Sequence, residues 1–72
     1  MWGDYQKRGL LDIGALWQNY RHGGVIEILR RIETSTSTVF LARGLDSGVT
    51  RRLTYEHLER EYRPYAGNRA VM

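Results

Sequence analysis

The chain of 72 residues contains no cysteine, which excludes disulfide bridges and thiolate metal sites. Its two histidines are too few to close a zinc site alone. The longest apolar run extends only from Val39 to Ala42, whereas a membrane span needs about 20 residues. The N-terminal residues do not show the charged and then apolar order of a signal peptide. We therefore expect a soluble, cytoplasmic protein that has no cofactor and no membrane partner.

The short length also limits the organisation of the chain to one small domain. A domain of this size buries only about 60% of its unfolded surface, so we expect marginal stability. No repeat or linker interrupts the sequence. We expect a flexible N-terminal arm over residues 1–8, a single domain over residues 9–65 and a flexible tail over residues 66–72.

Lysine is nearly absent as well, because Lys7 is the only lysine among 11 basic residues. Arginine forms planar paired contacts with phosphate or carboxylate, so its excess indicates a binding surface, although codon usage rich in G and C would produce the same bias. The formal net charge is +3, and residues 30–52 carry all of it, because charges cancel on either side. This localised excess of arginine is the main functional signal in the sequence.

Residues 25–54 have the pattern of a three-stranded antiparallel meander. The segments 25–32, 38–43 and 49–54 are rich in β-branched residues. A polar turn, ETSTS, separates the first two segments, and GLDSG separates the last two. After the meander, Tyr55 to Tyr62 is expected to form a short helix that Thr54 caps and that ends before Pro64.

Residues 9–22 fit two different structures. Leu10, Ile13 and Trp17 follow helical spacing, and Gly23 and Gly24 would suit a helix C-terminus. Against a helix, Gly14 lies inside the pattern and LWQNY alternates as a strand would. We favour the strand, which predicts an all-β fold. The alternative is an α+β fold with an N-terminal helix, a three-stranded antiparallel sheet and a short helix.

A strand that carries Trp17, the turn Gly23-Gly24, the meander 25–54 and the segment LEREYRP (58–64) together resemble the SH3-like small β-barrel. The resemblance covers about residues 12–66 and implies four to five antiparallel strands with a short C-terminal helical turn. The acidic and aromatic run of peptide-binding SH3 domains is missing, so proline-rich ligands are not implied. The chain looks more like short barrel proteins of phages and prophages, and such barrels host many functions.

Strand pairing predicts which residues share a face of the meander. If the first hairpin is centred between Ser35 and Thr36 and the second on Asp46, Phe40 lies between Arg31 and Arg52. The more apolar face should then form the core; it holds Ile26, Ile28, Ile32, Val39, Leu41, Val49 and Leu53. The other face would expose Phe40 between two arginines, as a platform for a base or a phosphate. Alternatively, Phe40 is a second layer of core, or the register is shifted by one residue.

The sequence shows no convincing catalytic arrangement. His22 lies beside two glycines without a carboxylate at a defined spacing, and His57 lies on a charged helix face. Phosphate-binding glycine motifs are absent. We therefore expect a protein that is not an enzyme.

Two functional hypotheses remain. The first is a small interaction protein, such as a phage-type regulator or inhibitor, that docks on an acidic surface of a larger protein, for example a nucleic-acid enzyme. The alternative is a small basic domain that binds DNA or RNA through an arginine and aromatic sheet face. The candidate residues are Arg31, Arg52, Phe40, Arg43, Arg21 and Lys7. A homodimer that forms through an exposed edge strand also stays open.

Overall fold

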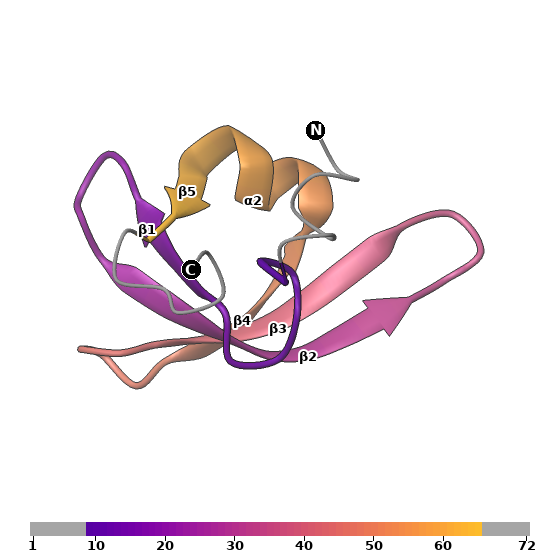
Figure 1. Cartoon of the computed structure of the whole chain (residues 1–72), viewed down its shortest axis with the longest axis horizontal. Coiled ribbons are helices and arrows are strands. Elements are labelled where there is room, and N and C mark those ends of the chain that lie inside the picture. Colours follow the sequence, from indigo (N-terminus) through magenta and orange to yellow (C-terminus); the bar gives the residue numbers. More distant parts are fainter. Residues whose placement is uncertain (1–8, 66–72) are drawn as a thin grey trace.

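The computed structural model describes residues 9–65 and shows an all-β fold with one short helix (Figure 1). The elements are β1 (Leu16–Asn19), β2 (Val25–Glu33), β3 (Thr38–Gly44), β4 (Thr50–Thr54), α2 (Tyr55–Glu61) and β5 (Tyr62–Pro64). The strands form one five-stranded antiparallel sheet in the order β4-β3-β2-β1-β5. The expected small, barrel-like β fold with a C-terminal helical turn is thus confirmed. The expected arm and tail, residues 1–8 and 66–72, lie outside the described residues.

The strand favoured within residues 9–22 is correct, and the N-terminal helix is wrong. β1 pairs with both β2 and β5, and its side chains alternate between partial and full burial. Residues 9–14 form turns instead of a helix, and the φ of +93° at Gly14 is incompatible with a right-handed helix. The helical spacing was misleading because Leu10 is buried from a turn, whereas Ile13 is 73% exposed.

The first hairpin of the meander has the expected register. Arg30 lies opposite Leu41, and Arg31 lies opposite Phe40. One feature was not expected: the β2–β3 register shifts between Ile28 and Arg30, so that Leu29 forms a β-bulge. Because a bulge adds one residue to one strand, it changes which side chains of that strand face the core.

The second hairpin is not centred on Asp46, and its register differs from the expectation by one residue. Leu41 lies opposite Arg52, and Phe40 lies opposite Leu53. The turn closes with a 2.9 Å hydrogen bond from Gly44 N to the carbonyl of Val49. Of the two glycines that bound the turn, only Gly48 has a positive φ, so Gly44 stays in β3. The turn is therefore centred between Asp46 and Ser47, and each β3 residue pairs with the β4 residue one position later than we expected.

These two shifts move several residues of the expected core to the outside. The expectation is correct for Ile26, Ile28 and Leu53, which are buried. It is wrong for the others, since Ile32 and Val49 are exposed and Val39 and Leu41 are half-buried. Phe40 is instead 0% exposed. The buried cluster consists of Leu10, Leu11, Ala15, Trp17, Ile26, Ile28, Phe40, Ala42, Leu53, Leu58 and Tyr62.

Helix α2 connects β4 and β5, the two edge strands of the sheet, and packs against the inner, core-lining face (Figure 1). As expected, Thr54 caps the helix: its Oγ1 accepts a 3.1 Å hydrogen bond from His57 N. Leu58 is buried in the core. Pro64 lies in the edge strand β5, a position that tolerates the missing N–H of proline. Within residues 9–65, no helix has the length and apolarity of a membrane span.

Candidate interaction surface

The outer face of β2, β3 and β4 carries an apolar strip between arginines. Leu41 is paired with Arg30 on one side and with Arg52 on the other, and Ile32 is paired with Val39 along the same strands. Residues that lie directly opposite share a face, so these five side chains form one surface, the outer patch. Both arginines are exposed, Ile32 is 38% exposed, and Val39 and Leu41 are half-buried.

The arginines of the outer patch are available to a partner. Neither Arg30 nor Arg52 forms an ion pair with another residue of the described range 9–65. Arg43 lies on the same face, but its Nη2 is 3.3 Å from Glu27 Oε1. Because an exposed ion pair contributes only about 0–1 kcal/mol, Arg43 can exchange Glu27 for a carboxylate of a partner at low cost.

The expected platform of Phe40 between Arg31 and Arg52 does not form. Phe40 is completely buried, so it offers no surface on which a base could stack. Arg31 shares the inner face with Phe40; its side chain is 19% exposed and its Nη2 lies 2.7 Å from Glu33 Oε2. Arg52 projects from the opposite face. The second-hairpin register accounts for this error, because a shift of one residue exchanges the two faces of a strand.

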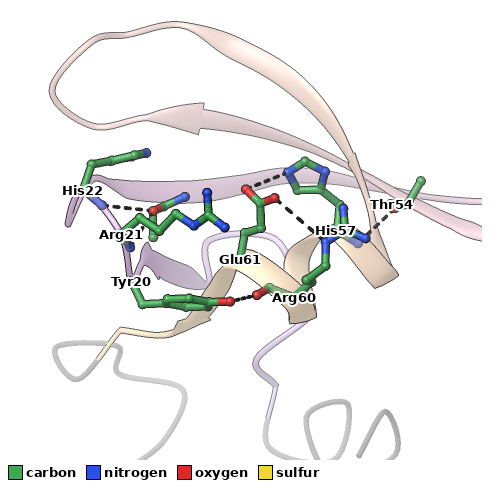
Figure 2. A network of polar contacts seen from close by, with 8 residues as sticks. Tyr20, Arg21, His22, Thr54, His57, Arg60 and Glu61 are labelled. Carbon is green, nitrogen blue, oxygen red and sulfur yellow. Dashed lines mark hydrogen bonds and ion pairs between the residues drawn. The ribbon is translucent and has the colours of Figure 1, made fainter.

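A further candidate, Arg21, does not belong to the outer patch. Arg21 lies in the turn between β1 and β2, where its backbone N–H donates a 2.8 Å hydrogen bond to Asn19 Oδ1. Figure 2 shows this turn beside the end of α2, where the Tyr20 hydroxyl donates to the carbonyl of Arg60. Lys7 lies outside the described residues.

Arg30 is a residue of this surface that the sequence interpretation missed, because its expected partner Leu41 was assigned to the core face. The β-bulge at Leu29 turns it outward. A signal for this bulge exists in the sequence: in VIEILRRI the alternation breaks at two consecutive apolar residues, Ile28 and Leu29, which two consecutive arginines follow. A break of this kind inside a strand is typical of an inserted residue.

A second feature is a pocket of about 230 Å³ between the β1–β2 and β3–β4 turns. His22, Asp46 and Ser47 all line it, and these are the residue types of a hydrolytic triad. Their hydrogen bonds do not form that arrangement. His22 Nδ1 accepts a 3.1 Å hydrogen bond from Gly24 N, whereas a triad needs Nδ1 to donate to the acid. Ser47 Oγ accepts from Val49 N at 3.2 Å.

The second histidine makes only a local contact. His57 Nε2 lies 3.6 Å from Glu61 Oε1 across one turn of α2, and Figure 2 shows this pair on the helix. Between residues 9 and 65, the structure contains no cluster of side chains that could hold a metal ion.

Comparisons with known proteins identify no relative: the chain matches no family model, no curated protein and no solved structure.

Proposed function

We propose that this protein is a small interaction module that docks through its outer patch on an acidic surface of a larger protein. The supporting observation is the combination of an aliphatic strip with arginines on both sides that have no ion-pair partner within residues 9–65. Such a surface suits a partner that presents an apolar centre with carboxylates around it. Following the resemblance to short phage barrels, the function is regulation or inhibition of such a partner, for example a nucleic-acid enzyme.

The chemistry of the outer patch favours a protein over a nucleic acid. Burial of Ile32, Val39 and Leu41 against an apolar surface contributes about 25 cal/mol for each Å² removed from water. Arg30 and Arg52 can each form paired hydrogen bonds with a carboxylate, which add specificity to the apolar contact. DNA or RNA would find phosphate contacts here, but none of the five residues that define the outer patch carries an aromatic ring on which a base could stack.

The test uses the full chain as bait, together with two variants of equal charge change. Arg30→Glu/Arg52→Glu reverses the charge of the outer patch, and Arg21→Glu/Arg63→Glu reverses two exposed arginines elsewhere. We expect a partner that the wild type and the control variant capture and the patch variant loses. With that partner purified, calorimetry should show at least about tenfold weaker binding for the patch variant.

Two results would contradict the proposal. One is a partner whose affinity is equal for the wild type and the patch variant. The other is micromolar binding of labelled DNA or RNA that falls with salt and is lost in the patch variant, since this would assign the surface to phosphate contacts. Circular dichroism of each variant verifies folding, which is expected because all four arginines are exposed.

A further inference from the structure

The pocket between the two turns lies on the opposite face of β4 from the outer patch. Arg51 lines it, and the register places Arg51 opposite Ala42, a residue of the core. Arg52, the next residue, belongs to the outer patch. The two neighbouring arginines therefore serve different surfaces, and a ligand of the pocket does not compete with a partner on the outer face.

The pocket combines an apolar base with polar groups. The buried Ile26 and Tyr62 and the half-buried Val25 line it, and we call these three residues its apolar base. His22, Ser47 and Arg51 line it as exposed polar residues. An apolar base with a few polar groups around it is the usual composition of a small-molecule site.

The polar groups are mainly hydrogen-bond donors. Because His22 Nδ1 accepts from Gly24 N, the neutral ring carries its proton on Nε2, which can donate. Because Ser47 Oγ accepts from Val49 N, its hydroxyl proton can also be donated. Arg51 adds a guanidinium that forms no ion pair with any residue between 9 and 65.

Two glycines allow these donors to lie close to the backbone. A Cβ at Gly24 would lie 2.8 Å from His22 Cε1, and a Cβ at Gly44 would lie 2.6 Å from Ser47 Oγ. Both glycines line the pocket and neither has a positive φ. A side chain at either position would therefore displace a donor of the pocket, although the backbone itself could accept it.

We propose that this pocket binds a small organic carboxylate with an apolar body. One guanidinium matches the two oxygens of one carboxylate, and the apolar base accommodates the rest of the ligand. Asp46, which also lines the pocket, offsets the charge of Arg51 and disfavours ligands with more than one negative charge. A volume of about 230 Å³ is below the roughly 300–1,000 Å³ of sites for drug-sized ligands, so the ligand is small.

The experiment is a titration of the ¹⁵N-labelled full chain with benzoate, followed by amide chemical shifts. Saturable shifts are expected at the pocket glycines Gly24 and Gly44, with a dissociation constant of about millimolar order for so small a ligand. Benzamide has the same shape without the charge, and acetate has the charge without the ring. Each should bind at least about tenfold more weakly than benzoate, since each lacks one half of the recognition.

Variants separate this site from the outer patch. Arg51→Met should weaken benzoate binding at least about tenfold, whereas Arg52→Met, the matched control on the other face, should leave it unchanged. Asp46→Asn should strengthen it several-fold, because the repelling carboxylate is removed. Capture of a protein partner should be weakened by Arg52→Met and unchanged by Arg51→Met. Failure of one proposal is therefore distinguishable from failure of the other.

Several outcomes would overturn the assignment. They are the absence of saturable shifts, equal binding of benzoate and benzamide, equal binding of benzoate and acetate, and equal losses in the two arginine variants. Benzylammonium that binds more tightly than benzoate and loses its affinity in Asp46→Asn would show a cation site instead. The dispersion of amide signals in each variant shows whether it is folded, and Arg51→Lys, which keeps a positive charge, should retain part of the affinity.

Discussion

Phe40 and Leu41 are neighbours in β3 with opposite environments. The Phe40 side chain is completely buried, in one cluster with Trp17 and Leu58. Leu41 projects to the outer face between two arginines. Substitution of each residue of this pair therefore tests which face of the sheet is the core. The expected register of the second hairpin places Leu41 on the core face, whereas the observed register places Phe40 there.

Phe40→Ala should lower the free energy of unfolding by about 3–5 kcal/mol, since it removes a fully buried ring and leaves a cavity. Leu41→Ala should lower it by only about 1 kcal/mol. Urea unfolding measures both values. Because the small domain has little stability to lose, Phe40→Leu serves as a milder variant. Its loss in the free energy of unfolding should still exceed that of Leu41→Ala. A greater loss for Leu41→Ala would mean that the outer patch is buried and not available to a partner.

Among the elements of residues 9–65, α2 is the only helix. It contains only seven residues, too few for stability on its own, yet it links the edge strands β4 and β5. Its first turn is held by the Thr54 cap and by Glu56 near the positive end of the helix dipole. At its C-terminal end, the carbonyl oxygen of Glu61 accepts a 3.2 Å hydrogen bond from the backbone N–H of Tyr20.

Thr54→Ala should therefore destabilise the protein by about 1 kcal/mol, within the usual 0.5–2 kcal/mol range for N-caps. Thr54→Ser, which keeps the accepting oxygen, should lose less than half of this. Thermal or urea unfolding of the two variants provides the comparison. Equal losses would show that the methyl group of Thr54, and not its hydrogen bond to His57 N, stabilises this junction.

For the molecule as a whole, the sheet is open and β4 is one of its edges. An unpaired edge invites pairing with a second copy, and charged side chains on an edge oppose it. Antiparallel pairing of two β4 strands over their full length, Thr50–Thr54, would place Arg52 opposite Arg52 of the second copy. The arginines of residues 30–52 are thus divided between the two faces of the sheet. Those in β4 also oppose pairing of this edge strand with a second copy.

The wild type is expected to be monomeric at micromolar concentration, as measured by sedimentation velocity. Arg51→Thr/Arg52→Thr keeps strand propensity but removes both charges, so it should shift the chain toward dimers. High salt should shift the wild type in the same direction, because it screens the repulsion. A wild type that is already dimeric in low salt would contradict this role of the arginines and would favour an edge-paired homodimer.

Local residue patterns were sufficient to predict β2, β3, β4 and the short helix. The β-branched segments predicted β2, β3 and β4 to within about one residue at each end, and Thr54 and Pro64 bounded the short helix region. Such features depend on neighbours in the chain, whose preferences are readable without the fold. The strand at Leu16–Asn19 was less certain, because its pairing partners, β2 and β5, include a segment more than 40 residues away.

The candidate site depended on the tertiary structure. Side chains alternate along a strand with a period of two, so one bulge at Leu29 and a shift of one residue in the β3–β4 register each exchange the faces of a strand. In this way Arg30 and Leu41 replaced Arg31 and Phe40 on the outer face. The amino-acid order alone established which segments become strands and that the positive charge lies in the middle of the chain. Which arginines share a surface was decided by packing, because Phe40 rather than Leu41 is buried in the core with Leu58 of α2.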